Sequence, residues 1–359
     1  MNHLTAITQV TNKCNQDCRY CYVSRVEEDM SKETFDILFD KLTKHVSGNI
    51  TIVWHGGEPL LRGLDFFQYA HGLIKQKAGN RTKESMQTNG TLITEDVANF
   101  LIKNNISYGI SLDGPKDVHD ANRYFCNGKG SFDTVMKRIA MLKKMGQHPS
   151  GIAVITKNSL QNIKEIYNFF NSEQISIKVN PVDVIGRSNL EKDNLSITPE
   201  EYGNALTELF DIWYNDKSTK IKIINLFDAM KTVAEGRHYG CLYSDNACGK
   251  SFIGVTPGGD IYPCSRFSHD TNFKLGNILN DDLEKIFSSP ICVEFSKRNS
   301  GLEECLGCKF KKFCNSGCPS RAFSEYDTIE HKDYYCTSTK IVFAHIQKVL
   351  KTEIERGLK

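Results

Sequence analysis

The sequence predicts an α/β protein: a partial (β/α)6 barrel, followed by a small Cys-rich domain and a C-terminal helix. Two observations lead to this fold class. Strand-like runs alternate six times with amphipathic helical runs between residues 4 and 182, which is typical of parallel strands joined by crossover helices. Beyond a bridging helix that runs through Trp213, that periodicity fades, and cysteines and glycines become frequent.

Each unit of the predicted barrel pairs a β-rich run with a helical pattern. The strands are expected at residues 4–10, 50–54, 85–88, 107–112, 151–155 and 175–182. The helices are expected from Ser31, across 64–74, from the cap Thr94, and across 132–145 and 163–170. The carboxyl ends of parallel strands share one edge of the sheet, so the loops after the strands should carry the chemistry.

A capping box at residues 198–201 starts a bridging helix through Trp213, with Pro199 at its first position. We place a domain boundary near residue 235. The predicted parts are a barrel with its bridging helix over 1–235, a Cys-rich domain over 236–336 and a C-terminal segment over 337–359, helical from about Ser338 to Leu350.

The bulk composition is that of an ordinary soluble protein. The 359 residues are 40% hydrophobic and 25% charged, with a formal net charge of +2, which argues against a nucleic-acid binder. The chain opens on strand-like sequence and has no long apolar run, so we expect neither a signal peptide nor a membrane span, and a cytoplasmic location. In that reducing compartment the 13 cysteines are better metal ligands than disulfide partners.

The loop after the first predicted strand holds Cys14, Cys18 and Cys21. Three thiolates suit an iron–sulfur cluster with one iron left open, because a structural zinc site and a fully protein-ligated cubane each take four protein ligands. The open iron can chelate a small molecule, for which Tyr20 would supply a flat wall. Half a zinc knuckle is the alternative interpretation of this spacing.

Gly56-Gly57-Glu58-Pro59 ends the second predicted strand. With the cysteine loop, it resembles the signature of radical S-adenosylmethionine (SAM) enzymes. The resemblance implies a 4Fe–4S cluster whose open iron binds SAM, and reductive cleavage of SAM to a 5'-deoxyadenosyl radical. It also implies SAM contacts from Tyr20, Gly56, Gly57, Glu58, Gln87, Asn89, Ser111, Asp113 and Arg138. The last five, as single polar residues, are equally explained as ordinary hydrogen bonds at the barrel rim.

A second array of cysteines lies near the C-terminus. It resembles the SPASM domain of radical SAM enzymes that modify peptides and proteins, and the resemblance implies two further 4Fe–4S clusters, three in all. The first would take Cys241, Cys248, Cys264 and Cys318, and the second Cys305, Cys308, Cys314 and Cys336. A pair of zinc ribbons is the alternative. Cys126 and Cys292 are left without a role.

The layout is similar to that of anaerobic sulfatase maturases, which oxidise cysteine or serine to formylglycine. Those enzymes place an aspartate, the proposed base, directly after the cysteine at Cys264, and a tyrosine at the position of Val23; here Ser265 follows Cys264. No catalytic base is identified from the sequence. The departures favour instead a maturase of ribosomally made peptides (RiPP maturation) that forms a crosslink such as a cyclophane or thioether. Formylglycine formation is kept as the alternative.

The expected partners follow from this function. They are a precursor peptide and a reduced flavodoxin- or ferredoxin-type electron donor, with no nucleic acid, no membrane and no built-in N-terminal peptide-recognition domain. Lys309, Lys311 and Lys312 could attract an acidic donor or leader peptide, or form a solvated face. Two other classes stay open: a non-enzymatic iron–sulfur electron carrier and a zinc-based interaction module.

Overall fold

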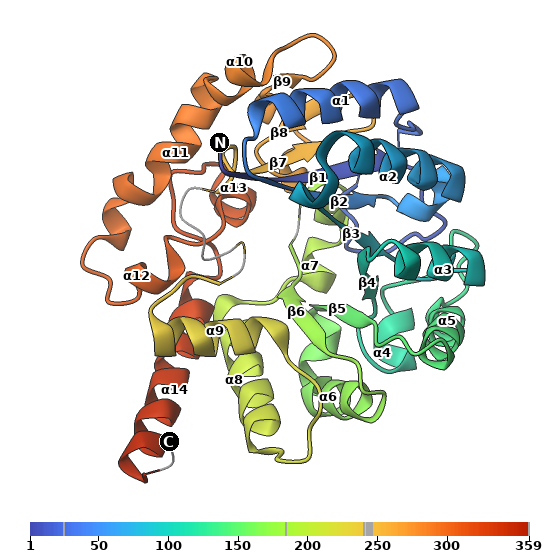
Figure 1. Ribbon diagram of the computed structural model, residues 1–359. Helices are drawn as coiled ribbons and strands as arrows, with labels where there is room; N and C mark the ends of the chain where they lie inside the picture. The colour runs from blue at the N-terminus through green and yellow to red at the C-terminus, as the bar shows by residue number, and fades with distance from the viewer. Residues whose placement is uncertain (24–25, 184, 240, 242–246, 358–359) are drawn as a thin grey trace.

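A computed structural model of the chain describes residues 1–359 except 24–25, 184, 240, 242–246 and 358–359 (Figure 1). Its sheet contains the six predicted parallel strands in sequential neighbour order. Their bounds are β1 His3–Thr11, β2 Asn49–Gly56, β3 Thr82–Thr88, β4 Ser107–Ser111, β5 Ser150–Ile155 and β6 Ile177–Pro181. The six-unit α/β alternation is therefore confirmed.

The connecting helices cover the outer side of the strands (Figure 1). They are α1 Lys32–His45, α2 Leu64–Ala78, α3 Glu95–Lys103, α4 Lys116–Asp120, α5 Phe132–Lys144 and α6 Ile163–Ser172. The predicted caps form: Ser31 Oγ accepts from Thr34 N at 2.9 Å, and Thr94 Oγ1 accepts from Val97 N at 3.3 Å. The short α4 was not predicted.

Three helices follow the barrel: α7 Lys192–Leu195, α8 Pro199–Asn215 and α9 Ile224–Glu235. The capping box of α8 is present, because Glu201 N donates to Thr198 Oγ1 at 3.1 Å and Thr198 N donates to Glu201 Oε2 at 2.7 Å. The sequence did not predict α9, which begins after Ile223 with no side-chain cap. It ends at Gly236, which has a left-handed backbone conformation. The predicted domain boundary near residue 235 stays a prediction.

The Cys-rich region adds β7 Phe252–Val255, β8 Asp260–Tyr262 and β9 Gly276–Asn277. β7 pairs in parallel with β1, and the antiparallel β8 and β9 continue the same sheet, an extension that the sequence did not predict. The helices are α10 Leu283–Phe287, α11 Pro290–Gly301, α12 Lys311–Cys314, α13 Pro319–Tyr326 and α14 Cys336–Glu355. α14 is the predicted C-terminal helix, longer at both ends, and it packs against α8 and α9.

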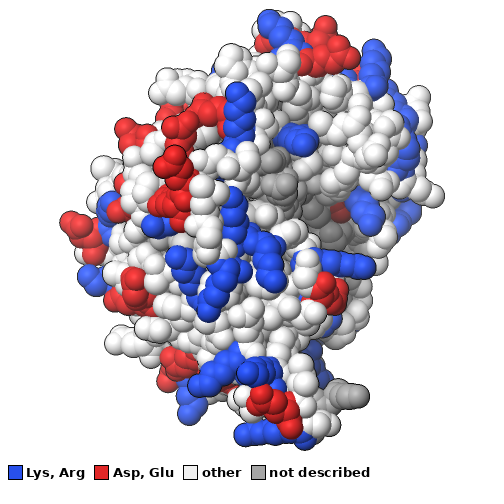
Figure 2. Space-filling model, turned by 90° about the vertical axis from the view of Figure 1, so that its left-hand side faces the viewer, with Lys and Arg blue, Asp and Glu red and all other residues white. Residues whose placement is uncertain are grey.

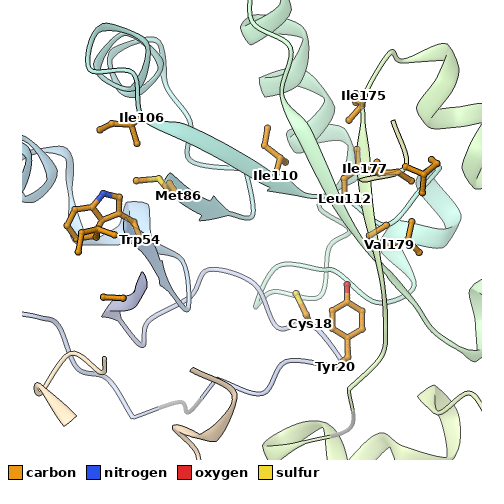
Figure 3. Packing of buried hydrophobic residues seen from close by; sticks show 14 of the residues in the cluster. Cys18, Tyr20, Trp54, Met86, Ile106, Ile110, Leu112, Ile175, Ile177 and Val179 are labelled. Atoms are coloured by element: carbon orange, nitrogen blue, oxygen red, sulfur yellow. The ribbon is translucent and has the colours of Figure 1, made fainter. Parts of the chain in front are cut away.

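Buried apolar side chains hold the strands and helices together. Trp54 of β2 packs on Phe35 of α1 and Phe66 of α2, with ring centroids 5.2 and 6.3 Å apart. Figure 3 shows the core running from Trp54 past Ile110 of β4 to Val179 of β6. The strand ends that carry the loops are thus fixed by packing. Within the described residues, no helix combines the length and apolarity that crossing a membrane would require.

Candidate active site at the carboxyl ends of the strands

The cysteine loop after β1 is held by backbone hydrogen bonds to the segment that follows α4. Asp17 N donates to Tyr124 O at 2.8 Å, and Arg19 N donates to Asn122 O at 3.0 Å. Cys126 N in turn donates to Asn15 O at 3.1 Å. These backbone hydrogen bonds fix the course of the cysteine loop.

The three thiols of this loop are neighbours. Cys18 is 9% exposed. Burial raises the pKa of its thiol to about 12; Arg123 acts in the opposite direction, and the nearby Cys21 and Cys14 raise the pKa further. Bringing buried thiolates together is costly unless a cation compensates their charge, so the set has the character of a cluster ligand set.

Tyr20 belongs to a buried ionic network. Its hydroxyl donates to Asp113 Oδ2, and Arg123 Nε donates to the same oxygen at 3.1 Å. The guanidinium lies 5.1 Å from the centre of the Tyr20 ring, and Asp113 Oδ1 accepts from Val154 N at 3.0 Å. In Figure 3 the side chains of Cys18 and Tyr20 stand side by side and point into the barrel. Tyr20 thus anchors the loop to β5, a role that the sequence did not indicate; its predicted contact with SAM stays a prediction.

The two glycines of the loop after β2 allow it to lie against the cysteine loop. Gly57 N donates to Thr11 O at 2.9 Å, and Glu58 N donates to Lys13 O at 2.8 Å. A Cβ on Gly56 would stand 2.2 Å from Thr11 O, and Gly56 has a φ of +138°. Only glycine fits so near another backbone. The two loops therefore lie next to each other, as predicted, and their backbones are in direct contact.

Glu58 connects the loops after β2 and β3. Its side chain is fully buried and accepts from Leu60 N at 3.1 Å, Thr88 Oγ1 at 2.7 Å and Asn89 N at 2.7 Å. Burial raises the pKa of the carboxyl group to about 7, although the three hydrogen bonds act to lower it. The carboxylate braces the two loops in this structure, and its predicted contact with the SAM ammonium stays a prediction.

The other polar residues predicted to contact SAM lie near the same strand ends. Gln87 Nε2 donates to Ser111 Oγ at 3.1 Å across β3 and β4. Asn89 Nδ2 donates to Asn15 Oδ1 of the cysteine loop at 2.8 Å. Arg138 reaches from α5 to Thr91 O, with Nε at 3.3 Å. The fold thus gathers side chains from the ends of two strands, from one loop and from one helix at the side of the sheet that carries the cysteine loop.

The first predicted SPASM set comes together in space. Burial raises the pKa of the Cys264 thiol to about 12, and the thiols of Cys241 and Cys318 are near enough to raise it further. Burial also raises the pKa of the Cys248 thiol, and the other three thiols of the set raise it further. Although the cysteines come from segments more than 70 residues apart, their thiols form one group.

The second predicted set also forms one group, which lines a pocket at the start of α14. Burial raises the pKa of the Cys314 thiol to about 11, and the nearby thiols of Cys336, Cys305 and Cys308 raise it further. All four thiols line the same pocket. The structure therefore brings together both sets of four that the resemblance implied.

Neither set is arranged for a single metal ion. Over the described parts of the chain, no three His, Cys, Asp or Glu side chains converge on one point as ligands of one ion. A tetrahedral zinc site would require such convergence. In a cubane each cysteine binds a different iron, so its ligand sulfurs need not converge on one point.

The position after Cys264 holds no acid. Ser265 is 4% exposed, and its hydroxyl approaches the phenol of Tyr22, whose pKa is raised by burial. His55, near the end of β2, is affected by the charge of Arg266, and burial lowers the pKa of its imidazole to about 4. Its Nδ1 accepts from Gly56 N at 2.8 Å, which leaves the hydrogen on Nε2. Neither Ser265 nor His55 is therefore a ready proton acceptor.

A buried ionic network connects the barrel to the Cys-rich region. Asp183, after β6, accepts from Arg266 Nη1 and from Arg321 Nε, the latter at 2.8 Å. Arg321 also lies 3.7 Å from Asp333 Oδ2, which accepts from Cys318 N at 2.8 Å. Asp183 thus joins two segments that carry predicted cluster ligands. Nothing in the sequence indicated this residue, because its partners lie 83 and 138 positions away.

Two cysteines have no assigned role. Cys126 is exposed and donates weakly to Cys14 O at 3.6 Å. Cys292 is 6% exposed and donates to Gly249 O at 3.2 Å, as a small buried side chain.

Two family models match the chain. Residues 8–170 match the Radical SAM superfamily, and residues 247–309 match the SPASM iron-sulfur cluster-binding domain. The cysteine-type anaerobic sulfatase-maturating enzyme of Clostridium perfringens is 30% identical over 354 residues, 94% of this chain and 95% of that enzyme. The serine-type enzyme of Bacteroides thetaiotaomicron is 30% identical over 362 residues, covering 93% of this chain and 86% of that one.

Solved structures give the same result. The structure of native anSMEcpe with bound AdoMet and Kp18Cys peptide matches with a TM-score of 0.87 and 28% identity, over 98% of this chain and 99% of that one. Streptococcus suis SuiB bound to S-adenosylmethionine matches at a TM-score of 0.68 and 17% identity, over 93% of this chain and 77% of that one, which shows a shared fold alone. The chain therefore belongs to the radical SAM enzymes with a SPASM domain, and it is close to the anaerobic sulfatase-maturating enzymes.

Proposed function

We propose that this chain oxidises a cysteine of a peptide or protein to formylglycine, as a maturase without a carboxylate base at position 265. The observation that carries the proposal is the cysteine loop packed on the glycine loop at the strand ends, in a chain that resembles cysteine-type maturases over nearly its whole length. The sequence alone favoured crosslinking; the comparisons favour the alternative.

The roles of the residues follow the predicted sets. Cys14, Cys18 and Cys21 would hold the cluster that binds SAM, beside the backbone of Gly56 and Gly57. When bound, the cluster and SAM supply a 5'-deoxyadenosyl radical that takes a hydrogen atom from a side-chain carbon. The two SPASM sets would hold the clusters that accept the remaining electron, and Gln87, Ser111 and Arg138 would contact SAM.

The neutral environment at position 265 favours cysteine over serine as the substrate. Two-electron oxidation of either side chain releases a proton. A thiol has a pKa of about 8.5 and ionises near neutral pH without a strong base, whereas an alcohol does not. A site with Ser265 in place of the aspartate can therefore complete the reaction on a thiol more easily. Relatives of both types match this chain at 30% identity, so the choice of cysteine depends on the chemistry at position 265.

A second candidate is crosslinking of a ribosomally made peptide. It is favoured by Ser265 and Val23, which replace the two residues that the sulfatase maturases carry at these positions. Val23 is 7% exposed and packs in the protein interior, so it offers no hydrogen bond to a substrate. A carbon radical that adds to an aromatic ring or a sulfur needs no ionised thiol.

One experiment separates the two products. The anaerobically reconstituted enzyme receives dithionite, SAM and one of three peptides: a sulfatase-type Cys-x-Pro-x-Arg peptide, its serine counterpart, or a peptide with an aromatic residue near its C-terminus. We expect an aldehyde, captured by a hydrazide, from the cysteine peptide, with release of sulfide and much less aldehyde from the serine peptide.

A different pattern of products would contradict the proposal. If SAM is cleaved while the cysteine peptide yields no aldehyde, formylglycine formation is wrong. An aromatic peptide that then loses two hydrogens without forming an aldehyde would assign the enzyme to crosslinking. The Cys18→Ala variant, which should release no 5'-deoxyadenosine, is the control for non-enzymatic chemistry.

A further inference from the structure

The pocket formed by the second cysteine set lies beside α12 and the start of α14. Cys305 is buried, whereas Cys308, Cys314 and Cys336 are partly exposed. Leu306, between the first two cysteines, is 63% exposed. Three of the four predicted cluster ligands are therefore accessible from the surface.

Lysines surround this pocket. Lys311, Lys332 and Lys340 line it, and Lys309 and Lys312 are exposed next to it. Lys332 pairs with Glu304 at 3.1 Å, which leaves four lysines around the pocket with no ion pair to a described acidic side chain. We call Leu306, Lys309, Lys311, Lys312 and Lys340 the lysine rim.

The rim is fixed by packing. The ammonium groups of Lys309 and Lys312 each lie 4.9 Å from a ring centre, over Phe310 and Phe313. Those two rings pack on Phe343 of α14 at 6.1 and 5.7 Å, so α12 and α14 present their lysines as one surface. Long side chains held in this way lose less entropy when a partner binds.

The charge on this side of the molecule is divided into zones. Figure 2 views the side on which α11, α12 and α14 lie in Figure 1, and its blue side chains gather across the middle, with the largest red group above them. Such a basic zone attracts an acidic partner and orients it as it approaches.

We propose that the lysine rim docks an acidic one-electron carrier protein, which exchanges an electron with the cluster held by Cys305, Cys308, Cys314 and Cys336. This inference rests on the proposed function. Removing two hydrogens from a substrate leaves, after transfer of one hydrogen atom, one electron and one proton. The oxidised carrier takes that electron and becomes reduced. Electron-transfer contacts are small, below about 1,200 Å², which suits a rim of this kind.

The test measures electron transfer without peptide or SAM. Flavodoxin in its hydroquinone form is mixed with the oxidised holoenzyme, and cluster reduction is followed by stopped-flow absorbance at several salt concentrations. The variant replaces three exposed lysines together: Lys309→Glu, Lys312→Glu and Lys340→Glu. We expect the second-order rate to fall about tenfold or more at low salt. The wild-type rate should fall towards that of the variant as salt rises.

A matched control carries the same charge change elsewhere. Lys103→Glu, Lys144→Glu and Lys164→Glu alter exposed lysines on α3, α5 and α6, which lie away from α12 in Figure 1. The control should keep the wild-type rate, and both triple variants should hold the wild-type iron content and react equally with titanium citrate.

Two results would overturn the docking proposal. One is an equal rate for both triple variants; the other is a rate for the lysine-rim variant that falls equally at low and at high salt, which would mean that charge does not guide the carrier to the rim. If wild-type enzyme shows no cluster to reduce, the proposed function itself fails, which is a distinguishable outcome.

Discussion

The protein gathers its cysteines in two different ways. In the barrel, Cys14, Cys18 and Cys21 lie in one short loop, held by backbone hydrogen bonds and by the Tyr20–Asp113–Arg123 network. In the Cys-rich region, the thiols come from segments far apart and meet because β7 joins β1 and Asp183 binds two arginines. The cysteines of the barrel are close neighbours in the sequence, whereas those of the Cys-rich region are brought together by the fold. Damage to one should leave the other intact.

The largest expected effect is a division of function between the two regions. Cys18→Ala should remove about 4 of about 12 iron atoms and abolish cleavage of SAM, whereas Cys314→Ala should also lose about 4 but still cleave SAM. Iron analysis and chromatography of 5'-deoxyadenosine measure both. Loss of all iron in either variant would mean that the regions are not independent, and stoichiometric zinc would exclude clusters altogether.

Next in size is the effect of breaking the long-range connection. Asp183→Asn removes the charge that the buried Arg321 and the partly exposed Arg266 share, and leaving Arg321 with only its longer contact to Asp333 should cost about 3 kcal/mol of unfolding free energy. Anaerobic denaturant unfolding measures the change. Asp29→Asn is the matched control: Asp29 pairs with Lys13 at 2.9 Å with both side chains about 40% exposed, so its loss should cost at most about 1 kcal/mol. Similar losses in both variants would contradict a special role for Asp183.

The same contrast explains what the sequence could predict. Strand–helix alternation, the helix caps and the spacing of the cysteine loop are all local, and the structure contains them. α9 was missed because no side chain caps its start, and β7–β9 were missed because short strands that extend a distant sheet have no local periodicity of their own. The grouping of the SPASM cysteines came from the family resemblance rather than from their spacing.

The sequence predicted the parts of the site that follow from strand ends, but not the side-chain contacts that depend on the fold. The positions of the glycine loop and of Gln87 and Ser111 follow from their being at strand ends. The brace made by Glu58 could not be foreseen, because it depends on the side chain turning inward to three donors on two loops. Nor could Arg123, which lies in an irregular segment with no motif that marks it.

Glu58 provides a pH test of the barrel loops. Its pKa is raised from 4.5 to about 7 in the folded protein, so the folded state binds this proton more tightly than the unfolded chain does. Stability from this group is therefore lost as the pH rises from about 4.5 to 7, by about 3 kcal/mol. Glu58→Gln cannot ionise. The unfolding free energy of the variant minus that of the wild type should rise by this amount across the window.

Anaerobic unfolding at pH 4.5, 6 and 8 tests this prediction. A difference that stays constant with pH would mean that the three hydrogen bonds fully offset the burial of the carboxylate. In that case Glu58 would hold the two loops as an ionised carboxylate, as Asp183 holds its two arginines.

The smallest expected effect separates the two supports of the cysteine loop. Tyr20→Phe keeps the buried ring but removes the hydroxyl that donates to Asp113, which still accepts from Arg123 and Val154. Losing a hydrogen bond to a charged group should cost about 2 kcal/mol. Tyr69→Phe, which removes a phenol that donates to Asp36 at 2.7 Å on the outer helices, is the control and should cost less because Asp36 is reached by water.

Iron content then decides which support matters for the cofactor. If the backbone hydrogen bonds to residues 122–126 shape the loop, Tyr20→Phe should unfold more easily yet still bind about 12 iron atoms per chain. A variant that loses about 4 of them would show instead that the side-chain network, and not the backbone, keeps Cys14, Cys18 and Cys21 in position. Both supports lie about a hundred positions along the chain from the loop, so the result would separate a side-chain support from a backbone support.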